Sequence, residues 1–129
     1  MLIKKKNSKT FYSELRNLTP DLKDLEVWSE FDQEGDGFIG ANILTNVAEQ
    51  AIIWTNQGKL KLIDKLFDFF ERSYSEFEDG SNAYIYTDFH PTIINCQNSE
   101  IREKIKSYMR PKTMTLYNQL IELGFYAEH

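Results

Sequence analysis

The segment from Leu60 to Phe77 constrains the fold of this chain more than any other part of the sequence. Its large apolar residues recur at alternating steps of three and four, which is the spacing of one face of an α-helix. This face is made of Leu60, Ile63, Phe67, Phe70, Tyr74 and Phe77. Charged and polar residues fill most of the other positions, and Asp79-Gly80-Ser81 follows as a stop signal. A long helix with one apolar side is stable only when it packs against other elements, so this segment is predicted to be the central helix.

Two shorter helices are predicted near the start of the chain. Asn7 or Ser8 can cap the first of them. Pro20 stands at the first position of a second helix that continues to Phe31. The next segment, Gln33–Gly40, holds three of the six glycines and is predicted to be a loop.

Further helices are predicted on either side of the central one. Apolar residues over 43–57 indicate a well-buried helix. The segment Ala83–Asn95 begins with residues of strand-like propensity, but its later part favours a helix, in which Pro91 predicts a kink or a late start. A short helix follows from Ser99, and a last one is predicted over 111–124.

These patterns predict an all-α fold. We expect a single domain over residues 1–129, with six or seven helices packed as an antiparallel bundle or a short array of helix pairs. Residues 1–8 are predicted to form a basic arm, free to be mobile. Hydrophobic residues make up 41% of the chain, which is enough apolar material to form a core.

The charge and composition argue against several classes of function. The formal net charge is −5, whereas a nucleic-acid binder normally carries the positive charge that neutralises phosphates. No apolar run approaches the ~20 residues that span a bilayer, so no membrane partner is expected. The single cysteine, Cys96, and the lack of a secretory signal favour the cytoplasm. An acidic surface can attract a cationic partner, or it can serve only to keep the protein soluble.

The segment from Asp32 to Ile43 resembles the calcium-binding loop of an EF-hand. Asp32, Glu34 and Asp36 occupy the first, third and fifth ligand positions, and Gly37 is at the sharp turn. The twelfth position, which should be a bidentate glutamate, is Ile43. Because this loss removes two oxygens and one negative charge, we interpret the segment as an acidic glycine-rich turn and predict no metal site.

No other pattern of catalytic or metal-binding residues is recognisable. The histidines are His90 and His129, and neither forms a zinc-type pair with another histidine or with Cys96. The sequence has no nucleophile elbow and no phosphate-binding glycine loop. Hydrolysis by paired carboxylates remains open, because acidic residues are abundant throughout. We therefore predict no catalytic residue and no cofactor.

The charges are unevenly distributed along the chain. Residues 21–36 contain seven carboxylates and one lysine, for a net charge of −6. Residues 64–79 carry a net charge of −4, and residues 100–112 carry +3. We call the two negative segments the first and the second acidic block. Aromatic residues interleave the second block, and such residues are enriched at the centres of protein interfaces.

The order of these elements resembles that of the small all-helical immunity proteins of bacterial contact-dependent inhibition and polymorphic toxin systems. The likeness covers most of residues 21–123 and is architectural. It is carried by the long apolar helix Leu60–Glu71, the acidic turn Ser75–Gly80, the segment Tyr84–Phe89 and the closing helix Thr113–Leu123. The EF-hand-like segment is not a requirement of that family.

The resemblance implies a non-enzymatic inhibitor that binds a toxin domain, often a basic nuclease, and blocks access to its active site. Acidic side chains would then meet cationic toxin residues as charge-assisted pairs. The predicted toxin-binding residues are Asp64, Asp68, Glu71, Tyr74, Glu76, Glu78 and Asp79. A monomer is favoured. A calcium- or ligand-responsive helical module is the alternative, and an enzyme or a generic scaffold is a third possibility.

Overall fold

A computed structural model describes residues 4–34 and 36–124, and over these residues it contains helices and no strand. The predicted all-α class is therefore confirmed. The helices are α1 (Ser8–Arg16), α2 (Pro20–Lys23), α3 (Trp28–Glu34), α4 (Asp36–Asn56), α5 (Leu60–Glu76), the π-helical turn η1 (Ile85–Phe89), α6 (His90–Ile94), α7 (Ser99–Lys106) and α8 (Pro111–Glu122). None of these helices is both long and apolar enough to cross a bilayer.

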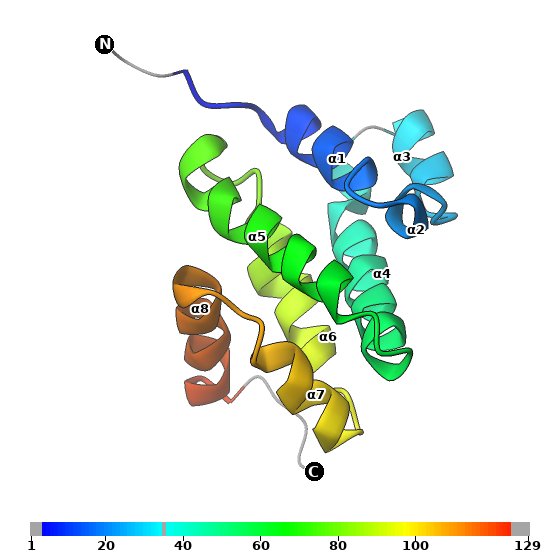
Figure 1. Cartoon of the computed structure of the whole chain (residues 1–129). Helices are drawn as coiled ribbons and strands as arrows, with labels where there is room; N and C mark the ends of the chain where they lie inside the picture. Colours follow the sequence, from blue (N-terminus) through cyan, green and yellow to red (C-terminus); the bar gives the residue numbers. More distant parts are fainter. Residues whose placement is uncertain (1–3, 35, 125–129) are drawn as a thin grey trace.

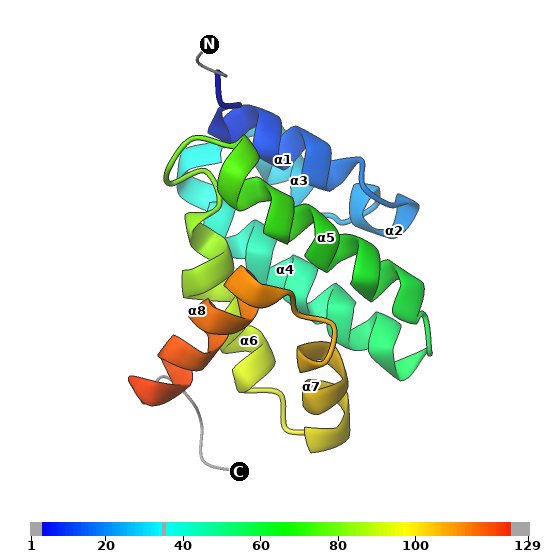
Figure 2. The same cartoon turned by 60° about the vertical axis from the view of Figure 1, so that its left-hand side comes forward.

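The helices α4 and α5 form the centre of the molecule (Figure 1). Helix α4 packs against α1, α2, α3, α5, η1, α6 and α7. The helices α1 to α3 lie along one side of the α4–α5 pair, while α7 and α8 lie on the opposite side (Figure 2). The face of α5 that the apolar spacing predicted is buried in the core, where Phe67 and Phe70 both pack edge-on against Phe89 of η1.

Several predicted helix boundaries are confirmed by their local hydrogen bonds. The Asn7 side chain accepts a bond from the Thr10 amide at 2.9 Å and so caps α1. The side chain of Thr19 caps α2 in the same way, with Pro20 in the first turn. Gly58, at a φ of 75°, follows the end of α4 in a conformation that favours glycine.

The single helix predicted from Pro20 to Phe31 is divided in two. Helix α2 ends at Lys23, and α3 begins only at Trp28. The indole N–H of Trp28 donates a 2.6 Å bond to the Leu22 carbonyl. This side chain satisfies a carbonyl at the end of α2 that would otherwise need a continuing helix.

The predicted loop over Gln33–Gly40 is wrong. Helix α3 continues to Glu34 and α4 begins at Asp36, so the described part of the segment is helical. Gly40 is buried within α4, where an added Cβ would collide with the Tyr12 hydroxyl of α1 and the ring of Tyr84. This glycine therefore permits close packing of three segments rather than a turn.

The ambiguous segment before Asn95 contains the π-helical turn. The amide of His90 bonds to the carbonyl of Ile85, five residues earlier, and α6 then begins with Pro91 in its first turn. Proline has no N–H to continue an α-helical ladder, and the π-helical turn stands just before Pro91. The backbone is helical from residue 83 to 94, so of the two predicted effects of Pro91 a late start of the helix does not occur.

Candidate protein-binding surface

Asp64 and Asp68, two of the predicted toxin-binding residues, are bound to Arg110 in the connection before α8. One guanidinium nitrogen lies 2.9 Å from Asp64 Oδ1 and the other lies 2.6 Å from Asp68 Oδ1. Arg72 also bonds Asp68, at 3.1 Å. Hydrogen bonds from Arg72 and Arg110 hold the pKa of Asp68 below its ordinary value, although partial burial opposes them.

Glu71 caps the N-terminus of α8. Its Oε2 accepts the Lys112 amide at 2.8 Å, while Oε1 accepts both the amide and the hydroxyl of Thr113, at 3.1 and 2.9 Å. A carboxylate at this position satisfies free amides and complements the helix dipole. The chain itself therefore uses the charge of Glu71 to hold α8 on α5.

The last carboxylates of the second acidic block differ in their surroundings. Glu76 lies 3.7 Å from the amine of Lys6 and 3.5 Å from Arg72. Lys6 is also held by its backbone, which exchanges hydrogen bonds with Glu76 and Glu78 at 2.9 and 2.7 Å. The side chains of Glu78 and Asp79 are exposed and make no ion pair within residues 4–34 and 36–124.

Tyr74, the predicted anchor, is half-buried and its hydroxyl points into the protein. This hydroxyl has no hydrogen-bond partner among the described residues. Burial raises the pKa of Tyr74 to about 12; the charge of Glu71 adds to the shift and Thr113 opposes it. Of the other aromatic residues in this block, Phe69, Phe70 and Phe77 belong to the core.

The first acidic block also contains carboxylates that are bound within the chain. Asp21 accepts a 2.7 Å bond from the indole of Trp54, which joins α2 to α4. Asp32 receives two bonds from the Arg16 guanidinium, at 2.8 and 3.1 Å. The Arg16 hydrogen bond lowers the pKa of Asp32, against a smaller opposing effect of burial.

The remaining described carboxylates of the first block are free. Asp24, Glu26 and Glu30 are exposed, and none of them has an ion-pair partner in the part of the chain that the structure describes. A groove of about 320 Å³ lies between α3 and α4, and Glu26 and Glu30 line it. Its lining is polar apart from one valine: Glu26, Val27, Ser29, Glu30, Asn42 and Asn46.

The outer side of α4 extends this groove. Asn42, Asn46, Glu49 and Ile53 follow one another at steps of four, three and four, so they share one face of the helix. Ile53 is unusual among the large apolar residues because 48% of it is exposed. We use the term α3–α4 surface for the set Asp24, Glu26, Glu30, Asn42, Asn46, Glu49 and Ile53.

The sequence contained one signal for this surface. The first acidic block has the larger net charge, −6, and its lysine, Lys23, is the only cation within the block. One neighbouring lysine cannot neutralise seven carboxylates, so an excess of negative charge had to remain in this block unless cations from distant parts of the sequence neutralised it. The spacing of aromatic residues directed the prediction to the second block instead.

The EF-hand-like segment has helical backbone on both sides of residue 35, and Asp32 is bound to Arg16. The side chains of Glu34 and Asp36 lie outside the described residues. Among those described, no group of three or more His, Cys, Asp or Glu side chains is placed to hold a metal ion.

Millimolar calcium is therefore expected to leave the thermal unfolding midpoint unchanged. A ligand that binds the native state raises the midpoint by mass action. Backbone that is helical up to Glu34 and again from Asp36 differs from the extended loop that wraps six to eight oxygens around a calcium ion. Differential scanning fluorimetry with and without calcium checks this, with magnesium as the control for general ionic effects. A calcium-specific rise would contradict the expectation.

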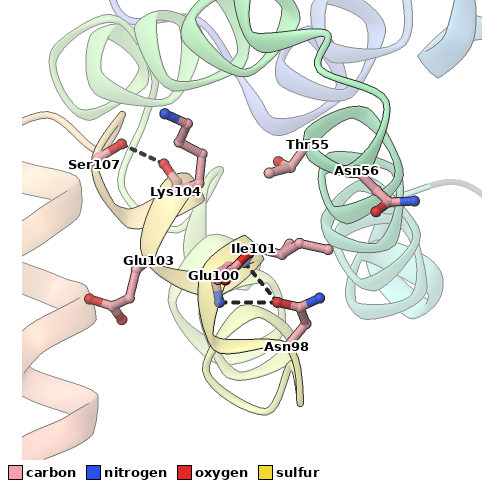
Figure 3. Close-up of a pocket in the computed structure, with 8 residues that line it drawn as sticks. All are labelled: Thr55, Asn56, Asn98, Glu100, Ile101, Glu103, Lys104 and Ser107. Carbon is pink, nitrogen blue, oxygen red and sulfur yellow. Dashed lines mark hydrogen bonds between the residues drawn. The ribbon is translucent and has the colours of Figure 1, made fainter.

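A second cavity, of about 610 Å³, opens between the end of α4 and α7 (Figure 3). Thr55 and Asn56 line one wall and residues of α7 line the other. Asn98 at its edge is occupied in capping α7, with bonds to the amides of Glu100 and Ile101. Glu100 and Glu103 bring two carboxylates to the lining and Lys104 brings one amine, so the lining is mixed in charge with a small negative excess.

No protein-family model, curated protein or solved structure matches this chain.

Proposed function

We propose that this protein is an immunity protein that binds a cognate bacterial toxin domain in the cytoplasm and covers its active site. The observation that carries the proposal is the set of unpaired carboxylates on the α3–α4 surface. Asp24, Glu26 and Glu30 stand within seven residues of each other, and among the described carboxylates the first acidic block leaves these three unpaired while the second leaves two, Glu78 and Asp79.

Free carboxylates are suited to a cationic partner for two reasons. They attract it over a distance and so raise the association rate, and they can form charge-assisted hydrogen bonds without first breaking an internal ion pair. The active site of a nuclease presents lysines and arginines that bind phosphate. A basic nuclease domain is therefore the toxin class that this surface fits best.

The α3–α4 surface also offers an apolar contact and a recess. Ile53, which is 48% exposed, lies on the same face of α4 as Glu49. The groove beside Glu26 and Glu30 can receive one or two long basic side chains, whose stems would pack on Val27. Charge at the rim and an apolar contact within the patch are the usual composition of a protein interface.

The carboxylates of the second block contribute to the proposal unequally. Glu78 and Asp79 are exposed and can contact a partner. Asp64, Asp68, Glu71 and Glu76 could do so only by sharing or giving up their bonds to Arg110, Arg72, Lys6 and the start of α8.

The function is tested by producing the chain together with the toxin domain encoded next to its gene. Growth of the producing cells and stoichiometric inhibition of the purified toxin are the expected results. If the chain neither binds that domain nor protects the cells, the immunity proposal is wrong.

Charge reversal locates the contact surface. The double variant Glu26→Lys/Glu30→Lys is expected to raise the dissociation constant for the toxin at least about tenfold and to slow association, because like charges then face each other. Biolayer interferometry at two salt concentrations measures both effects, and the loss should shrink at high salt.

Two matched variants control this experiment. Glu122→Lys on α8, which lies on the far side of the molecule from α2 and α3, should bind as the parent protein does (Figures 1 and 2). Glu78→Lys/Asp79→Lys tests the exposed end of the second block. Unchanged kinetics for Glu26→Lys/Glu30→Lys, with an intact fold, would remove the α3–α4 surface from the proposal.

A further inference from the structure

His90 is a buried polar residue that the proposed function does not use. Its side chain is 0% exposed, and neither ring nitrogen has a hydrogen-bond partner among the described residues. The imidazole packs edge-on between two aromatic rings, with centroid distances of 5.9 Å to Phe89 and 5.5 Å to Tyr117. Buried polar groups are normally paired, so an unpaired one needs an explanation.

The surroundings of His90 offer it no compensating charge. Burial lowers the pKa of His90 to about 3, and no neighbouring charge contributes to that shift. Helix α8 covers His90 with the side chain of Tyr117. Burial raises the pKa of Tyr117 to about 12. The other described titratable groups on the elements packed against α6 are Tyr86 and Asp88 on η1, Glu49 on α4, Lys112 and Glu122 on α8, and Glu100, Arg102, Glu103, Lys104 and Lys106 on α7.

None of these groups contributes to the pKa shift of His90, and several of them are engaged elsewhere. Asp88 bonds the hydroxyl of Thr87 at 2.6 Å, and Glu49 is exposed. Arg102 is held by the Cys96 carbonyl at 2.7 Å, and the amine of Lys106 lies over the ring of Tyr117. A protonated His90 would therefore be a charge without a partner, unless the residues that cover it move.

The covering element, α8, is attached at few places. Its main packing partners are α5 and α6, whereas α4 contacts most of the other helices. Glu71 and Arg110 hold its N-terminal end on α5, and the buried side chains on its inner face are Thr113, Tyr117 and Leu120. A terminal helix with so few attachments can open while the centre of the molecule stays folded.

We propose that α8 is an acid-released helix: protonation of His90 drives α8 away from α6, while the α4–α5 centre remains folded. Opening exposes the imidazole to water, where it takes up one proton. That uptake shifts the equilibrium toward the open state as the pH falls. The released state also uncovers the apolar side of Tyr117 and the core beneath it.

The sign and the pH range follow from this proton uptake. The pKa of His90 is lowered in the folded state, so its contribution to closure is complete above pH ~6.5 and declines as the pH falls toward 3. The lowered pKa of Asp68 places the loss of its ion pairs below pH ~3.8. Between pH 6.5 and 4, His90 is thus the group expected to open α8.

Hydrogen exchange of the full chain, followed by mass spectrometry and corrected for intrinsic rates, tests the proposal. Between pH 7.5 and 4.5 the protection of amides in 113–122 is expected to fall about 100-fold, since one proton changes the opening constant tenfold per pH unit below pH 6.5. Amides in 43–54 and 63–73 should keep most of their protection.

Three variants separate His90 from other causes. His90→Phe places an apolar ring in the same space, and His90→Leu serves if that ring does not fit; in either one the pH dependence of α8 should disappear. His129→Gln, the matched removal of the other histidine, should retain it. The proposal is overturned if α8 stays equally protected, if 43–54 loses protection in step with it, or if the His90 variants still respond.

Discussion

Replacing Glu71 by alanine is expected to lower the free energy of unfolding by about 2 kcal/mol. The carboxylate accepts three hydrogen bonds at the start of α8, from the Lys112 amide and from the amide and hydroxyl of Thr113. Loss of a capping side chain costs about 0.5–2 kcal/mol, and hydrogen bonds to a charged group contribute more than neutral ones. Thr113 is completely buried, so water cannot easily replace the lost acceptor.

Urea denaturation measures this loss as a lower midpoint with an unchanged slope, and thermal unfolding should show a decrease of about 7 °C for a chain of this length. Glu78→Ala is the matched control, because Glu78 lies just beyond the end of α5, the helix that contains Glu71, and is exposed without an ion pair among the described residues. The stability of this variant should stay within about 0.5 kcal/mol of that of the parent protein. Equal stabilities of the two variants would show that the cap does not hold α8.

This role changes how charge reversal on α5 must be interpreted. A lysine at position 71 or 68 would remove a toxin contact, if there is one, and would also detach α8 or Arg110 from α5. Weaker toxin binding by such a variant could then arise from altered structure. Glu78 and Asp79, which have no internal partner among the described residues, give the cleaner test of the second acidic block.

Replacing Gly40 by valine is expected to cost about 3 kcal/mol, the largest effect that we predict for a single substitution. A Cβ at this position would collide with the Tyr12 hydroxyl and the ring of Tyr84. Overpacking a core costs about 1–3 kcal/mol, and a second branch on Cβ places this variant at the upper end. Gly40→Ala should cost less, about 1 kcal/mol, because alanine is the better helix former.

Chemical denaturation of both variants checks the order of these losses. Asn42→Val places the same branched side chain two residues further along α4 at an exposed position, and it should change stability by less than about 1 kcal/mol. Combining Gly40→Ala with Tyr12→Phe, which removes the colliding hydroxyl, should recover part of the loss. If Gly40→Val is as stable as Asn42→Val, the close packing at Gly40 is not required.

The described helices show where local reasoning was sufficient. The spacing of apolar residues predicted α5 almost to its ends, because the side that a helix buries is set by a 3.6-residue period within the segment itself. The cap at Asn7 and the helix start at Pro20 were equally local. The predicted loop over Gln33–Gly40 failed because glycine serves turns and close packing alike, and only the neighbours of Gly40 show which applies.

The ion-pair partners of the carboxylates could not be predicted from neighbouring residues. The sequence by itself determined the all-α class, the central helix and the two acidic blocks, since periodicity, capping and net charge are properties of neighbouring residues. Only the tertiary structure decided which carboxylates are free. Asp64 bonds to Arg110, which lies 46 residues away in the sequence, and Asp68 bonds to the same arginine from 42 residues away. An ion pair depends on the few ångströms between two groups in space, and the folding of the whole chain sets that distance.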